Sequence, residues 1–238
     1  MNETIIIWGA GAIGGTVGAY LQRAGVPVVF VDRVSEHVAA INREGLCISG
    51  PIEEFTVKAQ AFLPEDLSGQ YRTILLCVKA HHTEVACDQL RPFLRDDGCV
   101  VSLQNGLNER VIARAFGGGR TIGAFVNFGA DYHGPGNIHF GGRGAVVVGE
   151  LDGRITDRVR QLHQHLLHFD EKAVTTSNIM GFLWGKMSYG ALLYATALTN
   201  ESIVDVLGSK QHRHCLSALA QEVLSVATAE KVKPERTS

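Results

Sequence analysis

A glycine-rich turn near the start of this chain limits its fold more than any other segment does. The stretch TIIIWGAGAIGG, residues 4–15, places Gly9, Gly11 and Gly14 after an apolar run and at the head of a helical pattern. In this context the first glycine permits a tight turn, the second lets backbone approach a ligand, and the third lets helix pack on strand. The spacing predicts the first strand, turn and helix of a parallel α/β sheet.

The same turn has the features of a dinucleotide-binding loop. A helix that starts at Ala12 and Ile13 would present free N–H groups and a positive dipole end to a pyrophosphate. We therefore expect Gly9, Gly11, Ala12, Ile13 and Gly14 to bind a cofactor. The alternative is a tight turn that binds no ligand.

Strand-like and helix-like segments alternate through the first three quarters of the chain. This alternation predicts a Rossmann-type, doubly wound α/β domain over residues 1–176. Strands are expected at 4–8, 26–31, 73–78, 99–103 and near 172–174, and helices at 12–24, 35–44, 81–95, 107–116 and 155–168. Three β-type runs within 120–149 predict antiparallel strands that extend the sheet.

The pattern becomes purely helical after Thr176. We expect an all-helical domain over 177–238, involved in substrate binding or dimerisation, whose first helix is capped by Ser177. A second amphipathic helix, within residues 209–232, should end at Pro234. A homodimer is left open.

Composition excludes several classes of protein. The net charge is −2 with no basic stripe, so no nucleic-acid partner is expected, and no apolar run reaches membrane-spanning length. The N-terminus lacks the features of a signal peptide. Five scattered cysteines without a C-x-x-C pair are typical of free thiols in the cytoplasm.

The residues after the second strand point to two different cofactors. Asp32 lies 18 residues beyond Gly14, where a carboxylate would bond the adenosine ribose of NAD(H) and repel the 2′-phosphate of NADP(H). Arg33 follows at once and could bind that phosphate. The choice between the two cofactors stays open.

Two further polar residues end strands. Lys79 and Asn105 should face the crevice beyond the carboxyl ends of the strands, where they could contact cofactor and substrate. Each residue alone could be a solvated lysine or a turn asparagine. The histidine clusters at 163–168 and 212–214 are interpreted as solvated helix faces, and no metal site is expected.

One lysine begins an otherwise apolar helical run. Lys186, Gly190 and Tyr194 recur at intervals of four residues and share a helix face. Burial would lower the pKa of the lysine and suit it to general-acid catalysis. The alternative is a lysine whose stem packs while its charged end reaches solvent. Gly190 costs about 1 kcal/mol of helix stability, which suggests close approach of a ligand or another helix.

Five segments that include these residues occur in a characteristic order: GAGAIGG (9–15), CVKA (77–80), LQNGLN (103–108), NIMGFLWGKM (178–187) and AQEVLSVATAEKV (220–232). With them the chain resembles the ketopantoate reductase (2-dehydropantoate 2-reductase) family, an oxidoreductase family of pantothenate biosynthesis. The resemblance implies hydride transfer from NADP(H) to a small 2-keto acid. It also implies that Lys186 protonates the alkoxide, that Lys79 and Asn105 lie beside nicotinamide and substrate, and that Arg33 binds NADP.

The chain departs from this family in two places. The family's substrate-binding asparagines fall at the positions of Gly190 and Tyr194, so we expect an apolar 2-keto acid to be preferred over ketopantoate. The family also continues through further helices that supply a glutamate and a serine, so we expect the helical domain here to be incomplete. Two rivals remain: a non-catalytic NAD(P)-binding redox sensor and a β-hydroxyacid dehydrogenase.

Overall fold

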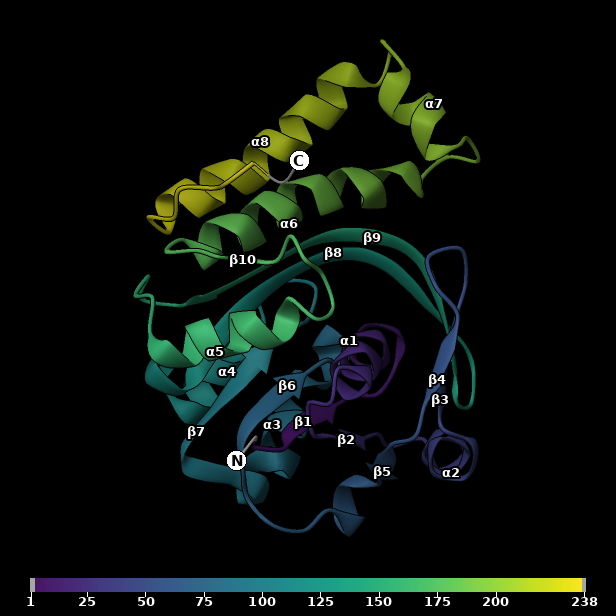
Figure 1. Ribbon diagram of the computed structural model, residues 1–238. Helices are drawn as coiled ribbons and strands as arrows, with labels where there is room; N and C mark the ends of the chain where they lie inside the picture. The colour runs from purple at the N-terminus through teal and green to yellow at the C-terminus, as the bar shows by residue number, and fades with distance from the viewer. Residues whose placement is uncertain (1–2, 237–238) are drawn as a thin grey trace. The chain divides into compact units, whose positions relative to one another are not determined.

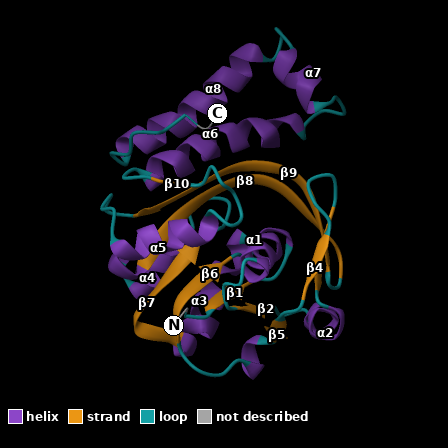
Figure 2. Cartoon of the chain, in the orientation of Figure 1, coloured by secondary structure: helices purple, strands orange, loops and turns teal. Residues whose placement is uncertain are grey.

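The computed structural model describes residues 3–236 (Figure 1). The chain folds into two compact units, Met1–Ser177 and Asn178–Ser238. Figure 2 shows that the first unit contains the strands and that the second consists of helices and loops. A mixed α/β unit followed by helices confirms the predicted fold class.

The first unit is built on one ten-stranded sheet with the order β4-β3-β9-β8-β7-β6-β1-β2-β5, and β10 pairs with β9. From β5 to β8 all neighbours are parallel, whereas β8 and β9 form a long antiparallel hairpin. Figure 1 shows this hairpin as a pair of curved strands. The strands are β1 (Ile5–Trp8), β2 (Val28–Val31), β3 (Leu46–Ser49), β4 (Phe55–Val57), β5 (Gln60–Phe62), β6 (Tyr71–Leu76), β7 (Leu94–Ser102), β8 (Thr121–Gly134), β9 (Asn137–Glu150) and β10 (Val174–Thr175).

Helices cover both faces of the sheet. The α-helices of this unit are α1 (Ala12–Arg23), α2 (Ser35–Glu44), α3 (Thr83–Leu90), α4 (Glu109–Phe116) and α5 (Asp157–Leu166). Short 3₁₀ turns are η1 (Pro64–Asp66), η2 (Ala80–His82), η3 (Arg91–Phe93) and η4 (Gly118–Arg120).

The first strand shows why its sequence is apolar without alternation. Ile5 and Ile7 belong to a buried cluster that includes residues of α1 and α5, while Ile6 and Trp8 belong to a second cluster with residues of α3 and α4. Successive side chains of a strand point to opposite faces, so a strand covered on both sides needs apolar residues at every position.

The first unit differs from its sequence prediction in three places. The segment 120–149 contains two long strands joined by a tight turn, not three runs. The helix expected at 81–95 ends at Leu90, because Arg91–Phe93 is a 3₁₀ turn with Pro92 and β7 already begins at Leu94. Strands β3, β4 and β5 were not foreseen, and β4 and β5 have only three residues each.

The second unit contains α6 (Ile179–Thr196), α7 (Ile203–Gly208) and α8 (Arg213–Ala229). Asn178, not Ser177, is the N-cap of α6, because its side-chain oxygen accepts the Gly181 N–H at 3.2 Å. The chain after α8 returns to this cap, where the Glu235 N–H donates to the Gly181 carbonyl at 2.9 Å. Helix α8 ends five residues before Pro234, and Lys231 has a left-handed backbone with φ 59°.

Candidate functional site

The glycine loop between β1 and α1 has the three properties that the motif predicts. Gly9 has φ +99°, and a Cβ atom there would lie 2.9 Å from the Val78 nitrogen. A Cβ atom at Gly14 would lie 2.8 Å from side-chain atoms of Cys77 and Ile7. A Cβ atom at Gly11 would meet nothing within 4 Å among the described residues. Gly9 and Gly14 are therefore required by the fold, while the space at Gly11 is open for a ligand.

The start of α1 can receive an anion at this open space. Gly11 is the N-cap and supplies no side-chain hydrogen bond to the first turn, where Ala12 and Ile13 lie half-exposed. Free N–H groups and the helix dipole together favour a phosphate at such a position. The residues present thus fit the pyrophosphate of a dinucleotide.

Ala10, at the centre of this loop, is clamped by two side chains. Its N–H donates to Asp32 Oδ2 at 2.8 Å, and its carbonyl oxygen lies 2.9 Å from His37 Nε2. The other imidazole nitrogen, Nδ1, accepts the Gly136 N–H at 2.9 Å. An N–H can only donate, so Nε2 carries the proton in this neutral ring. His37 is 1% exposed and joins the glycine loop to the β8–β9 turn.

Asp32 has a structural role that its sequence position did not reveal. Besides the bond from Ala10, its Oδ1 accepts the Val34 N–H at 3.0 Å. Arg33 is exposed beside it. On the other side of β1, after β6, partial desolvation and the charges of His81 and Arg33 lower the pKa of His82. Arg33 and His82 are thus close enough to repel one another when both are charged.

Lys79 and Asn105 lie on neighbouring loops at the carboxyl ends of β6 and β7, and both are exposed. A buried side chain joins the two loops: Gln104 Nε2 donates to the Val78 carbonyl at 2.8 Å and to Thr83 Oγ1 at 2.9 Å. Asn108 Nδ2 donates to the Asn105 carbonyl at 2.8 Å.

This polar network was missed from the sequence. Its side chains Gln104, Thr83 and Asn108 are buried, and nothing in a single sequence distinguishes a buried glutamine or threonine after a strand from a solvated one. The LQNG motif indicated the loop but not its supports.

The network borders a buried acid. Glu109, the first residue of α4, is 0% exposed, and burial raises the pKa of its carboxyl to about 7. Its own backbone N–H and the Ser102 hydroxyl favour the charged form but do not offset the burial.

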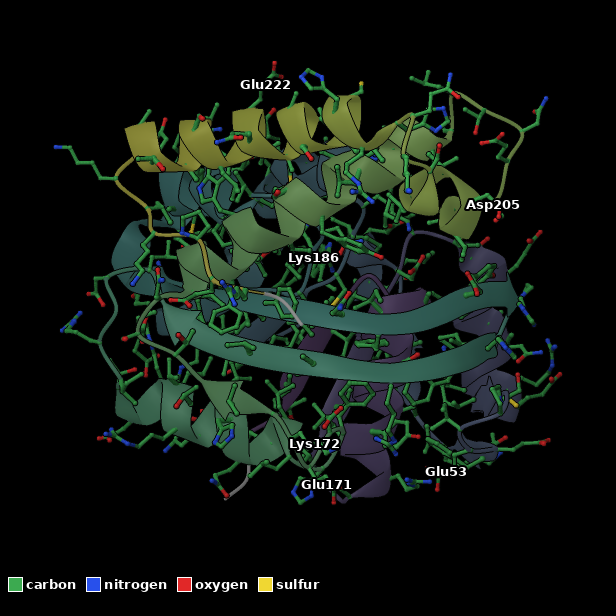
Figure 3. All side chains as sticks on the ribbon, turned by 90° about the horizontal axis from the view of Figure 1, so that it is seen from above. Glu53, Glu171, Lys172, Lys186, Asp205 and Glu222 are labelled. Carbon is green, nitrogen blue, oxygen red and sulfur yellow. The ribbon has the colours of Figure 1, made fainter. Side chains whose placement is uncertain are left out.

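In the second unit, Lys186 projects from α6 (Figure 3). It is half-buried, and burial lowers the pKa of its ammonium group. Tyr194, two turns further along the helix, is 83% exposed. A Cβ atom at Gly190 would meet nothing within 4 Å among residues 3–236. No neighbouring helix in the described chain therefore requires a glycine at this position.

The cysteines, the possible metal ligands and the apolar helices are further candidate functional features. The five cysteines are free thiols. Within residues 3–236 no three His, Cys, Asp or Glu side chains are grouped so that they could bind a metal ion, and His163 Nε2 lies 2.7 Å from the Ala173 carbonyl. No helix in this range is both long and apolar enough to cross a membrane.

Comparison with known proteins defines the family. Residues 5–153 match the model of the ketopantoate reductase PanE/ApbA family, so the chain belongs to that family. This matched range includes the glycine loop and the loops of Lys79 and Asn105.

Individual relatives agree with this assignment. The 2-dehydropantoate 2-reductase of Pyrococcus horikoshii is 33% identical over 184 residues, which cover 76% of this chain and 59% of the relative. That of Archaeoglobus fulgidus is 32% identical over 193 residues, covering 80% and 62%. The crystal structure of 2-dehydropantoate 2-reductase from Geobacter metallireducens superposes with a TM-score of 0.82 at 28% identity, covering 93% of this chain and 74% of that one. The chain thus spans about three fifths of the length of these two curated relatives.

Proposed function

We propose that this chain is part of a nicotinamide-dependent reductase that converts a small 2-keto acid to the 2-hydroxy acid. The observation that supports the proposal most strongly is the glycine loop, in which Gly9 and Gly14 are fixed by contacts while the space at Gly11 stays open. Curated family members named 2-dehydropantoate 2-reductase support the reaction class.

In this reductase, separate residues would bind the cofactor, bind the keto acid and donate the proton. Gly11 and the first turn of α1 bind the pyrophosphate, with Ala10 held by Asp32 and His37. When bound, the nicotinamide supplies the hydride. Lys79 attracts the carboxylate of the keto acid, and Asn105 donates or accepts at the carbonyl end. Lys186 donates a proton to the oxygen as negative charge develops there.

The choice between NADP(H) and NAD(H) is set by Asp32 and Arg33 in this proposal. The two backbone N–H groups bound to Asp32 stabilise its charge without removing it, so it still repels a 2′-phosphate. The exposed Arg33 attracts the same phosphate. We therefore propose use of both cofactors with modest discrimination.

The substrate is proposed to be an apolar 2-keto acid. Gly190 has no polar side chain and Tyr194 presents an exposed ring, so the hydroxyl of ketopantoate would lose partners at these two positions.

The test is steady-state oxidation of NADPH and NADH by the full-length protein with a panel of 2-keto acids that includes ketopantoate. We expect turnover, with a higher kcat/KM for an apolar 2-keto acid than for ketopantoate. Dinucleotide binding without turnover of any keto acid would instead indicate a non-catalytic binding protein. Ketopantoate as the best substrate would contradict the interpretation of Gly190 and Tyr194.

Lys186→Ala tests the proton donor within the same assay. Loss of a general acid should lower kcat by about 10²–10⁴ while the Kd of the cofactor changes little. Lys172→Ala, at an exposed lysine of the first unit, is the matched control and should retain parental kcat. If Lys186→Ala keeps more than half of the parental kcat, Lys186 has a structural role instead.

The pH dependence of the parent gives a second test of Lys186. Its kcat should fall as pH rises through the lowered pKa of Lys186, because only the ammonium form donates a proton.

A further inference from the structure

The loops of Lys79 and Asn105 depend on one continuous set of hydrogen bonds. Ser102 Oγ donates to Gln104 Oε1 at 3.4 Å, and the Gln104 amide group donates in turn to Val78 and Thr83. The Thr83 hydroxyl lies 2.7 Å from the Ala80 carbonyl and 3.2 Å from Asn108 Oδ1, and it can donate to one of them at a time. Any change in the direction of one donor therefore affects its neighbours.

Glu109 is the ionisable group beside this set. Neither of its carboxyl oxygens has a hydrogen-bond partner of ordinary geometry among the described residues, and the side chain is fully buried. The groups that act on it are its own backbone N–H and the Ser102 hydroxyl, and no charged side chain contributes. The carboxyl is therefore neutral until the pH approaches 7, where proton loss places an unpaired charge in the interior.

Such a charge cannot remain without donors. The side-chain donor that acts on it is the Ser102 hydroxyl, which now donates to Gln104. If Ser102 turns to the carboxylate, Gln104 Oε1 loses this donor, and the amide that joins the two loops is then held only through the two hydrogen bonds of its Nε2.

We propose that Glu109 is a positioning residue whose neutral form keeps the Ser102–Gln104–Thr83–Asn108 network intact and thereby holds the Lys79 and Asn105 loops in their binding arrangement. Ionisation of Glu109 loosens both loops. The inference rests on the proposed function for its effect on the cofactor, while the effect on the loops is a property of the first unit alone.

The size of the effect follows from the fraction of protein with a neutral carboxyl. With a pKa of about 7, this fraction falls from about nine tenths at pH 6 to about one tenth at pH 8. If only the neutral form binds the nicotinamide end well, the apparent Kd of NADPH or NADH should rise about tenfold over this range.

Two measurements on the full-length protein test the proposal. The first is hydrogen exchange of the backbone amides in residues 78–83 and 104–109 without ligand, corrected for the intrinsic pH dependence of exchange. Protection in the parent should fall between pH 6 and pH 8, whereas Glu109→Gln, which keeps the shape but cannot ionise, should show constant protection. Glu84→Gln is the matched control, since the Glu84 side chain in the first turn of α3 is exposed. Its amide protection should fall with pH as in the parent.

The second measurement is the Kd of NADPH and NADH over the same pH range. Between pH 6 and pH 8 the Kd of the parent should rise about tenfold, whereas the Kd of Glu109→Gln should stay constant. Constant loop protection in the parent from pH 6 to pH 8 would overturn the proposal without any need for the variant to fold. A pH-dependent loss of protection with no dinucleotide binding at any pH would support the role of Glu109 and overturn the proposed function instead.

Discussion

The glycine loop and the paired loops of Lys79 and Asn105 lie at the carboxyl ends of adjacent strands, but they are stabilised in different ways. The glycine loop owes its shape to missing side chains, because Gly9 and Gly14 sit where a Cβ atom would collide with Val78, Cys77 or Ile7. The paired loops owe theirs to buried polar side chains that come from separate segments.

This difference determines how each region can fail. A side chain added to the glycine loop acts by steric overlap, which does not depend on pH. The paired loops depend on hydrogen bonds beside an ionisable carboxyl, so their stability changes with pH. The proposed cofactor site thus combines a glycine loop fixed by close packing with neighbouring loops whose stability depends on pH.

Gly14→Val should give the largest effect. A Cβ atom at this position overlaps the Gly9 carbonyl as well as the side chains of Cys77 and Ile7, all of which lie in the packed sheet. We expect a loss of about 3 kcal/mol or more in the free energy of unfolding, measured by urea denaturation, at acid and neutral pH alike. Parental stability of this variant would show that the loop is not fixed by close packing.

Glu109→Gln should give the next largest effect, and this effect should depend on pH. The carboxyl has a pKa of about 7 in the folded state and an ordinary acidic value when unfolded, so the native state binds the extra proton. Its contribution to stability is complete below the unfolded pKa and is lost as pH rises to about 7. Relative to the parent, the variant should therefore gain about 3 kcal/mol between pH 4.5 and pH 7.5.

The check is urea unfolding of parent and variant at several pH values. Glu84→Gln should show no such gain, since that carboxylate is exposed. A parallel pH dependence of parent and Glu109→Gln would mean that the buried acid does not titrate as described.

His37→Asn should give a smaller effect on the glycine loop. The shorter amide can still accept the Gly136 N–H but cannot reach the Ala10 carbonyl, which would be left without its partner. We expect a loss of about 1–3 kcal/mol in stability and weaker dinucleotide binding. His163→Asn on α5, which removes the contact with the Ala173 carbonyl, should lower stability without changing the cofactor Kd. Equal effects of the two variants on the cofactor Kd would show that His37 has no specific role in shaping the glycine loop.

The same contrast explains what could be predicted from the sequence. The strand, turn and helix around Gly9–Gly14 are specified by neighbouring residues, and the structure confirms the fold class. Lys79 and Asn105 each follow a predicted strand. They were expected to lie close together because the carboxyl ends of parallel strands meet at one edge of the sheet. By contrast, His37 meets Gly136 across 99 residues and Gln104 meets Thr83 across 21. Such contacts exist only once the sheet has brought distant segments together, so no local pattern predicted them.

Gly11→Val distinguishes a glycine loop that binds a nicotinamide dinucleotide from a tight turn that binds no ligand. A Cβ atom at this position would meet nothing within 4 Å among residues 3–236, so the variant should lose far less stability in urea than Gly14→Val. The same side chain would occupy the place of the pyrophosphate. We predict that titration of the full-length protein with NADPH and NADH shows binding by the parent and at least about a hundredfold weaker binding, about 2.7 kcal/mol, by the folded variant. Equal dissociation constants for parent and variant would show that the glycine loop does not bind the pyrophosphate.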